Sequence, residues 1–333
     1  MFNNFSRDVQ NSYNLQNKHL YKKKTGNAKG YYQLAFDESL NTDLKVLHGM
    51  YKQGLPFRIY GLHTNLYITD NGYNGLFVDI DTKNSNIQFN KETEEFIATA
   101  NLTVGELVNY SKTLGYDFSA LTGIPGLIGS GVVGNSSYAG SLINENYKKG
   151  FSYFTKKIIV YDFETGDFVT MIPDNNFFGV RDSLLKQANK IKTRYFVKEV
   201  ILKADYIGEE EVTKLYNAQM EERKDALKIS FAEGNAGSFF SNPHIRESIG
   251  KVMKILLLEN PSINIDINGA TFSPDGNKSF RTGTGTTDKD AANCLQHVVN
   301  KVKEIYGIDL HKEVNILDND GEINFETFIT RNI

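Results

Sequence analysis

Hydrophobic positions recur along this chain at two spacings, and each spacing predicts a different kind of element. Apolar residues at every third or fourth position predict a helix over 41–53, which Gly54 ends. Short apolar or alternating runs bounded by turn residues predict strands. These strands are expected at 31–34, 57–60, 66–69, 76–80, 88–100 (two strands), 158–162, 167–172 and 196–204. The strand-helix-strand order at the start of the chain suggests a small α/β unit there.

Capping residues mark the ends of further helices. Thr103 followed by Glu106 is typical of a capping box and predicts a helix that ends at Gly115. A cap at Thr287 or Asp288 predicts a helix over 288–306 that stops at Gly307. Further helices are expected at 209–228 and 245–258. They are followed by two short strands around Val314 and Ile323, joined by a turn at 318–321.

The charged helix at 209–228 starts abruptly, which predicts a domain boundary near Ile207. We expect a polar, loosely ordered lead-in over 1–24 and a large domain over 25–207, with subdomains of about 25–82 and 83–207. A smaller domain is expected over 208–333.

Composition narrows the functional classes. The chain has 333 residues, 40% of them apolar, and a net charge of −3, which is ordinary for a globular protein and gives no reason to expect a nucleic-acid partner. Cys294 is the only cysteine, so an intramolecular disulfide and a cysteine-based zinc site are both excluded. No signal-peptide pattern and no apolar run of about 20 residues is present. We therefore expect a cytoplasmic protein without membrane association, and no metal site.

A glycine-dense run over 124–140 is the most informative stretch. Five glycines, together with small serines and Ala139, remove side chains there; the glycines are Gly126, Gly129, Gly131, Gly134 and Gly140. Such a run occurs where the backbone bends sharply or approaches something closely. A phosphate-bearing cofactor bound by bare N–H groups is one explanation, and tight turns between strands are the other.

Five segments together resemble one family in their order and spacing. They are Gly-Leu-His-Thr-Asn-Leu at 61–66, the run beginning Ile-Pro-Gly at 124–140, Phe-Gly-Val-Arg-Asp-Ser at 178–183, Gly-Asn-Ala-Gly-Ser-Phe-Phe-Ser-Asn-Pro at 234–243, and Tyr-Gly-Ile-Asp-Leu-His-Lys-Glu-Val at 306–314. The pattern resembles the UDP-N-acetylenolpyruvoylglucosamine reductase family from about residue 25 to the end, and most weakly between 245 and 288.

The resemblance implies a vanillyl-alcohol-oxidase-type FAD-binding fold of two α/β subdomains, followed by a smaller α+β substrate domain. It implies an FAD enzyme that uses NADPH to reduce the enolpyruvyl group of a nucleotide sugar, giving UDP-N-acetylmuramate for peptidoglycan. We expect a monomer or weak dimer. The cofactor-binding residues implied are Gly61, Thr64, Asn65, Leu66, Ile124, Pro125, Gly126, Gly129, Ser130, Gly131, Asn135 and Gly140.

The resemblance also implies a catalytic trio. Ser238 is expected to donate a proton, Arg181 to bind and polarise the substrate carboxylate, and Glu313 to assist protonation. Asn242 is expected to contact the substrate or NADPH. Each trio residue also has an ordinary reading, as an ion pair with Asp182, a turn serine or a surface glutamate.

This chain departs from the family pattern at several positions. Leu62 and His63 stand where the family is rich in glycine, Val180 replaces an aromatic residue, and Ser241 replaces a lysine. The segment before the last long helix is also shortened, since 277–287 offers no extra helix. Two alternatives therefore stay open: an FAD oxidoreductase of this fold with another substrate, and an inactive nucleotide-binding relic.

Overall fold

The computed structural model describes residues 4–14, 26–137, 149–230, 235–241, 259–272, 279–283 and 285–333. The chain forms two compact units. The first unit comprises Met1–Tyr13, Lys29–Leu62 and Gly75–Arg223, and the second comprises Asn14–Ala28, His63–Asn74 and Lys224–Ile333. The predicted helix at 245–258 lies outside the described residues, and the predicted boundaries at 24, 82 and 207 stay predictions.

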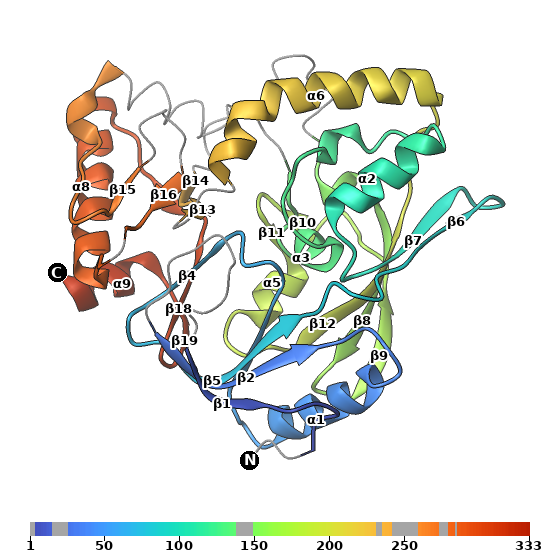
Figure 1. The fold of residues 1–333 in the computed structure, drawn as a ribbon, viewed down its shortest axis with the longest axis horizontal. Coiled ribbons are helices and arrows are strands. Elements are labelled where there is room, and N and C mark those ends of the chain that lie inside the picture. The colour runs from blue at the N-terminus through green and yellow to red at the C-terminus, as the bar shows by residue number, and fades with distance from the viewer. Residues whose placement is uncertain are drawn as a thin grey trace. The chain divides into compact units, whose positions relative to one another are not determined.

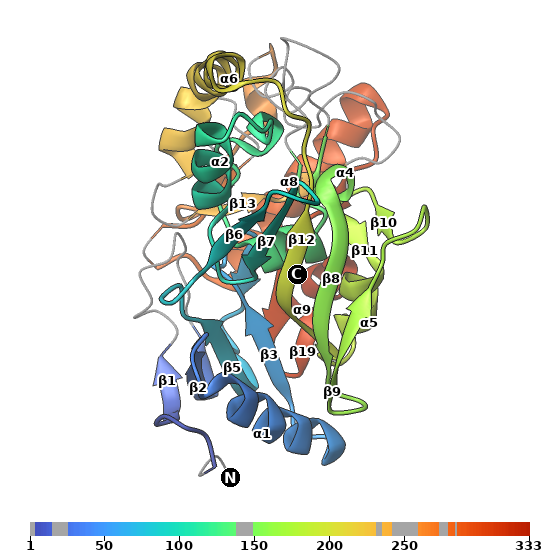
Figure 2. The same cartoon turned by 90° about the vertical axis from the view of Figure 1, so that its right-hand side faces the viewer.

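A five-stranded antiparallel sheet forms the larger half of the first unit (Figure 2). Its order is β6 (Ile87–Asn90), β7 (Glu95–Thr99), β12 (Tyr195–Leu202), β8 (Thr155–Asp162) and β9 (Asp167–Met171). The predicted hairpin is confirmed, because Ile158 pairs with Met171 and Asp162 pairs with Asp167 across the turn.

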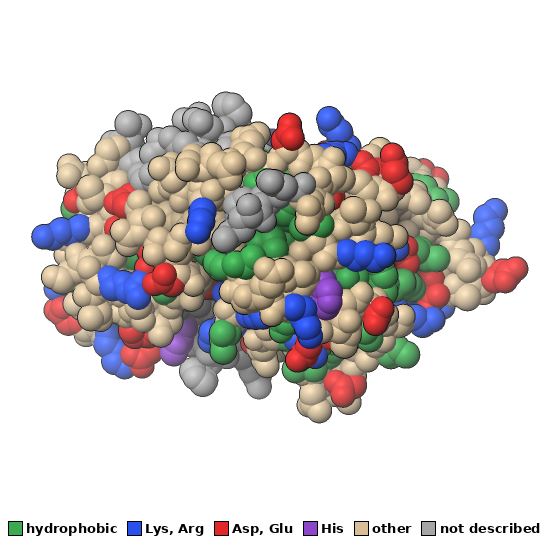
Figure 3. All heavy atoms as spheres, turned by 90° about the horizontal axis from the view of Figure 1, so that it is seen from below, with side chains coloured by type: hydrophobic (Ala, Val, Ile, Leu, Met, Phe, Trp, Pro, Cys, Tyr) green, Lys and Arg blue, Asp and Glu red, His purple; other side chains and the backbone are tan. Residues whose placement is uncertain are grey.

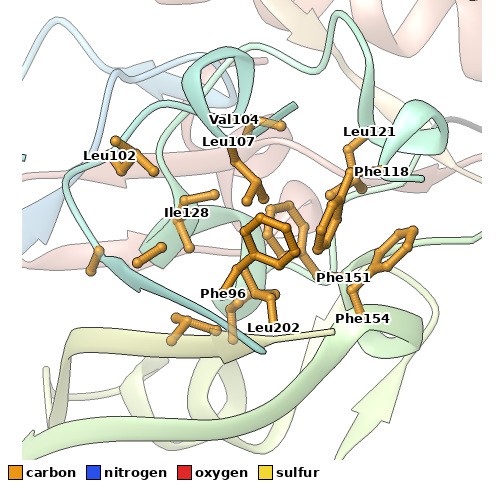
Figure 4. Packing of buried hydrophobic residues seen from close by; sticks show 14 of the residues in the cluster. Phe96, Leu102, Val104, Leu107, Phe118, Leu121, Ile128, Phe151, Phe154 and Leu202 are labelled. Carbon is orange, nitrogen blue, oxygen red and sulfur yellow. The ribbon is translucent and has the colours of Figure 1, made fainter. Parts of the chain in front are cut away.

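The core of this half lies between the sheet and a set of short helices (Figure 4). Phe96, Leu107, Phe118, Ile128 and Phe151 are all fully buried and point toward one another. Burying one such side chain stabilises the fold by about 1.5–3 kcal/mol. The contributing helices are α2 (Val104–Thr113), a 3-10 turn (Ser119–Leu121), α3 (Ile128–Val133) and α4 (Phe151–Phe154).

The predicted start of α2 is confirmed. Glu106 N–H donates to the Thr103 hydroxyl at 3.2 Å, and the Glu106 carboxylate accepts from Thr103 N–H at 2.8 Å. Helix α6 (Glu209–Ser230) lies beside α2 (Figures 1 and 2), with the Lys112 ammonium 4.1 Å from the centre of the Tyr216 ring. The unit boundary at Arg223 falls within α6.

A second sheet, β1-β2-β5-β3, packs with helix α1 (Leu40–Lys52). Its strands are β1 (Gln10–Asn14), β2 (Asn27–Leu34), β5 (Tyr73–Ile80) and β3 (Phe57–Tyr60). The predicted helix is confirmed as α1, with Leu44 and Leu47 on its buried face. The predicted strand at 57–60 is confirmed as β3. The parallel pair β3–β5 makes this half the α/β-like part of the chain.

The expectation of a loosely ordered lead-in is wrong for residues 4–14. Strand β1 forms there, and Ser6 donates from both its N–H and its hydroxyl to the buried carboxylate of Asp43, at 2.9 and 2.8 Å. The Tyr32 hydroxyl donates to the same carboxylate. These contacts are polar, so a hydrophobic pattern could not indicate them.

The second unit combines small sheets with helices α8 and α9 around its own core. The sheets are β13 (Asn235–Ser238), β16 (Ser279–Arg281) and β15 (Thr271–Phe272); β14 (Phe240–Ser241) and β17 (His311–Lys312); and β19 (Gly321–Ile323), β18 (Asn315–Asp318) and β4 (Leu66–Ile68). Helix α8 (Asp288–Tyr306) is confirmed with both predicted ends, a Thr287 capping box and a left-handed Gly307. Helix α9 (Phe325–Asn332), not anticipated, adds Phe328 to the core.

Neither the described helices nor the face drawn in Figure 3 points to a particular class of partner. Within the described residues, no helix combines the length and the apolar character that crossing a bilayer requires. The face in Figure 3 carries basic and acidic side chains interspersed with one another.

Candidate active site

The glycine run is partly helical, and two of its glycines are explained by protein packing. A Cβ on Gly129 would lie 2.8 Å from the Ala100 Cβ, and one on Gly131 would lie 2.4 Å from the Phe151 ring. Their N–H groups donate to the carbonyls of Ala100 and Leu127, at 2.9 and 2.8 Å. The packing of α3 therefore explains the small residues at these two positions. Both amides already donate to backbone carbonyls, so a cofactor contact there, which stays a prediction, would not use these N–H groups.

The start of the run and the Gly61 segment lie close together in the first unit. A Cβ on Gly61 would lie 3.1 Å from the Ser130 hydroxyl, so only a residue without a side chain fits there easily. Gly126 has φ 140°, a backbone conformation that favours glycine. The Ser130 hydroxyl itself donates to the Leu127 carbonyl at 3.0 Å. Two of the predicted cofactor segments thus meet at Gly61 and Ser130.

Arg181 occupies the tip of a two-residue hairpin. Strands β10 (Phe178–Gly179) and β11 (Asp182–Ser183) pair across Val180 and Arg181. Arg181 has φ 56°, in the left-handed region that is costly for a residue with a side chain. Val180 is 77% exposed and packs little.

Three hydrogen bonds fix this hairpin in place. The Asn135 side-chain amide donates to the Gly179 carbonyl at 2.8 Å, and the Lys186 ammonium donates to the Arg181 carbonyl at 3.0 Å. The Ser183 hydroxyl donates to the Val133 carbonyl at 2.7 Å, while it accepts from Lys186 N–H at the start of α5 (Leu184–Asn189). The arginine hairpin is thereby tied to the end of the glycine run, and strain at Arg181 is sustained by its neighbours.

In the second unit, a β-bulge sets the direction of Ser238. Asn235 pairs with Arg281 and Ser238 pairs with Ser279, so β13 advances three residues while β16 advances two. The additional residue is Gly237, with φ 79°. Its neighbours Ala236 and Phe239 are both buried in the core, whereas Ser238 is half-buried. The bulge therefore turns Ser238 away from the core, as bulges beside active sites commonly do.

The Ser238 strand lies directly against the predicted cofactor segment at 64–66. A Cβ on Gly237 would lie 2.6 Å from the Thr64 carbonyl oxygen. The Asn65 side-chain amide donates to the Glu313 carbonyl at 3.2 Å, and Glu313 N–H donates to the Phe239 carbonyl at 2.8 Å. Within this unit the structure brings Asn65, Ser238 and Glu313 into one neighbourhood. Arg181 lies in the first unit, and a site shared by all three catalytic candidates stays a prediction.

A buried acidic cluster anchors the strand β4 that follows Asn65. The Tyr67 hydroxyl donates to Asp288 at 2.7 Å, and Asp70 N–H donates to the same carboxylate at 2.6 Å. Burial raises the pKa of Asp288 to about 6, and the two hydrogen bonds offset only part of that rise. Burial also raises the pKa of Asp318, but hydrogen bonds from Thr69 and other donors outweigh it and leave that pKa lowered.

His63 takes a glycine-like backbone shape. Its φ is 56°, and its side chain is only 4% exposed. The chain thus keeps a left-handed conformation at a position where it carries an imidazole instead of a glycine.

Among the buried polar atoms without a hydrogen-bond partner in the described residues, two lie in or beside the predicted cofactor segments: the Asn65 side-chain carbonyl and the Thr122 hydroxyl. An unsatisfied buried group costs about 1–3 kcal/mol, so a ligand that pairs with it gains that energy. Thr122 was missed by the sequence reasoning, although it is separated by only Gly123 from the Ile-Pro-Gly motif. Gly140 and Asn242 lie outside the described residues.

Comparison with known proteins agrees with this architecture. The family model described as "UDP-N-acetylenolpyruvoylglucosamine reductase, C-terminal domain" matches residues 229–317. A UDP-N-acetylenolpyruvoylglucosamine reductase of Rickettsia conorii is 27% identical over 310 residues, 92% of this chain and 95% of that protein. One from Bacillus velezensis is 26% identical over 270 residues, 80% of this chain and 81% of that protein.

The fold is shared with a solved structure of UDP-N-acetylenolpyruvylglucosamine reductase from Thermus caldophilus. The TM-score is 0.65 at 19% identity, over 93% of this chain and 98% of that one. This likeness confirms the expected mixed fold with a separate carboxyl-terminal part. The family-model match at the carboxyl-terminal part, the relatives that cover most of the chain and this shared fold all show similarity to UDP-N-acetylenolpyruvoylglucosamine reductases.

Proposed function

We propose that this protein catalyses the NADPH-dependent, FAD-dependent reduction of UDP-N-acetylglucosamine enolpyruvate to UDP-N-acetylmuramate. The relatives carry the reductase name over most of the chain, and the fold is the same. The observation that carries the proposal is the bulge at Gly237, which directs Ser238 away from the core beside Asn65 and Glu313.

The described residues fit FAD. Gly61 is kept free of a side chain, and the unpartnered Asn65 carbonyl and Thr122 hydroxyl offer polar atoms to hydroxyl or ring N–H groups of a ligand. Residues of the 61–66 and 124–137 segments would hold the cofactor. When bound, FAD supplies the hydride that NADPH provides to the alkene of the substrate.

Ser238 is the proposed proton donor to the second alkene carbon. A serine hydroxyl is a weak acid, so it needs support from neighbouring donors or a relay. Glu313 directly follows β17, and its N–H donates to the carbonyl of Phe239, the residue after Ser238. We assign Glu313 the role of assisting this proton transfer.

Arg181 is the proposed ligand of the enolpyruvyl carboxylate. A guanidinium donates two parallel hydrogen bonds to a carboxylate, and its charge stabilises the negative charge that develops during hydride addition. The three hydrogen bonds that fix the hairpin restrict where Arg181 can be, which reduces the entropy lost on binding.

The proposal is tested with Ser238→Ala and, as a control, Ser262→Ala at an exposed serine of the same unit. Stopped-flow absorbance separates flavin bleaching by NADPH from reoxidation by the enolpyruvyl sugar. Ser238→Ala is expected to leave bleaching intact and to slow reoxidation at least about 100-fold, in line with the loss of a general acid. Reoxidation at the control rate in Ser238→Ala would show that the role assigned to Ser238 is wrong.

The cellular setting follows from the same proposal. We assign the enzyme to the cytoplasm, where its nucleotide-sugar substrate is made and consumed, and expect a monomer or weak dimer. Fractionation of cells expressing the full chain and sedimentation of the purified protein test these two points.

A further inference from the structure

Arg281 is a cation on the strand that pairs with the Ser238 strand. Strand β16 runs between β13 and β15, with Arg281 opposite both Asn235 and Thr271. The Arg281 side chain is half-buried, and its Nε atom is buried without a hydrogen-bond partner. Within the described parts of the chain, no carboxylate forms an ion pair with Arg281.

Strand alternation puts Arg281 on the face of the sheet that does not form the core. Phe280 and its partner Phe272 are buried, with ring centres 5.4 Å apart. Neighbouring residues on a strand point to opposite faces, so Arg281 points away from the core that holds Phe280. The buried Nε atom has no hydrogen-bond partner among the described residues, so the guanidinium has a donor to offer to a ligand.

Ser238 points to that same face. Because of the bulge, Ser238 is turned away from the core and is paired with Ser279, two residues before Arg281. Residues two apart on a strand share a face and lie about 7 Å apart. The proposed proton donor and an arginine that pairs with no carboxylate of the described residues thus lie on one surface, separated by roughly the width of a sugar ring.

We infer that Arg281 binds a phosphate group of the ligand that occupies this surface. This inference rests on the proposed function, which places the reacting carbons of the substrate beside Ser238. The substrate carboxylate is attached directly to a reacting carbon, whereas its diphosphate lies across the sugar ring, at a distance that suits Arg281. The planar guanidinium matches two phosphate oxygens at once, and a partly buried cation gains from such a pair. NADPH brings phosphate groups as well, so the same chemistry has two sources.

Equilibrium binding distinguishes these sources without any turnover. Isothermal titration calorimetry is run with UDP-N-acetylglucosamine in one arm and NADP⁺ in the other, on the wild-type chain, Arg281→Gln, Arg281→Lys and the control Lys301→Gln. Lys301 lies on α8, and its ammonium pairs with Glu304 at 2.8 Å. Arg281→Gln is expected to raise the Kd for UDP-N-acetylglucosamine about 10–100-fold, the usual loss for a charge-assisted bond. Arg281→Lys should recover part of this affinity, and the control should match the wild type.

Every outcome decides the inference. A loss of affinity for NADP⁺ alone would mean that Arg281 binds a phosphate group of the reductant rather than of the nucleotide sugar. Unchanged Kd values for both ligands in Arg281→Gln, or a wild type that binds neither, would overturn it. Thermal unfolding of each variant checks that the fold is intact, and Arg281→Lys stands in if the Gln variant unfolds. Because binding is measured without chemistry, a protein that binds but does not turn over separates a failed function from a failed role for Arg281.

Discussion

The side-chain amide of Asn65 donates to the carbonyl oxygen of Glu313 at 3.2 Å, across a separation of 248 residues. Asn65 also receives Asn315 N–H on its own backbone carbonyl, at 3.3 Å. The segment assigned to the cofactor and the segment that carries a catalytic candidate are therefore held by the same residue. We therefore expect a change at Asn65 to affect both segments.

Asn65→Asp should uncouple these two segments. The new carboxylate cannot donate to the Glu313 carbonyl, and two oxygens then face each other, so we expect a loss of about 1–3 kcal/mol in the free energy of unfolding. The oxidative half-reaction should slow as well. Asn300→Asp is the control, because Asn300 is exposed and uses its side-chain oxygen to accept from Gln296, which an aspartate also does. Urea unfolding that finds both variants equally stable contradicts this account.

Gly237→Ala should disrupt the bulge that directs Ser238. The new methyl group would meet the Thr64 carbonyl at 2.6 Å, and the φ of 79° is strained for alanine. Gly307→Ala is the matched control, since Gly307 has φ 68° but open space around its Cβ position. The control carries only the backbone strain, about 1 kcal/mol.

Gly237→Ala should cost measurably more than Gly307→Ala in urea unfolding, and it alone should slow flavin reoxidation. Equal costs for the two variants, with reoxidation unaffected, would mean that the close approach to Thr64 has no consequence.

Lys186→Met should loosen the Arg181 hairpin without touching the substrate. The ammonium no longer reaches the Arg181 carbonyl, so the arginine spends less time in its bound position. We expect a higher KM for the enolpyruvyl sugar, by about 3–10-fold for one lost hydrogen bond, and unchanged bleaching by NADPH. Lys190→Met, at an exposed lysine four residues further on, serves as control. Steady-state kinetics in which both variants behave as wild type would refute this positioning role.

Asp288 should make the protein less stable as the pH rises from about 4 to about 6. Its pKa is about 6 in the folded protein and close to 4 when unfolded, so the folded state holds the proton more tightly. The stability that protonation contributes is fully present below about pH 4 and is lost as the pH rises through 6, by up to about 3 kcal/mol. Asp318, whose pKa is lowered, acts in the opposite direction at lower pH.

Asp288→Asn is neutral at every pH, and it should remove the decline between pH 4 and 6. Urea unfolding at a series of pH values measures this, with wild type and variant compared at each pH. A wild-type profile that rises monotonically over this range, and parallels that of the variant, would show that Asp288 ionises normally.

The sequence predicted elements whose ends carry local signals. Helix α8 was anticipated at both ends because Thr287 and Gly307 act through bonds within a few residues. The helix inside the glycine run was not, because Gly129 is required by its approach to Ala100, almost 30 positions earlier in the chain. Such packing cannot be read from spacing alone.

The candidate site shows the same difference between local and long-range signals. The Gly-Ser-Phe-Phe motif pointed to Ser238 as a candidate. The bulge that directs Ser238 depends on pairing with β16, and the need for Gly237 depends on its approach to Thr64, which is distant in the sequence. Arg281 lies in the region of weakest resemblance. Its proposed role could be inferred only from the pairing of its strand with the Ser238 strand.

The central claim is that this chain carries reducing equivalents from NADPH through FAD to the enolpyruvyl sugar. An anaerobic double-mixing experiment tests it most directly, with the flavin absorbance near 450 nm followed while NADPH and then the enolpyruvyl nucleotide sugar are added to the FAD-loaded protein. The account predicts bleaching by NADPH and a full return of colour with the sugar, with one UDP-N-acetylmuramate formed per flavin reoxidised. A protein that takes up no FAD, or a reduced flavin that the sugar leaves colourless, would contradict it.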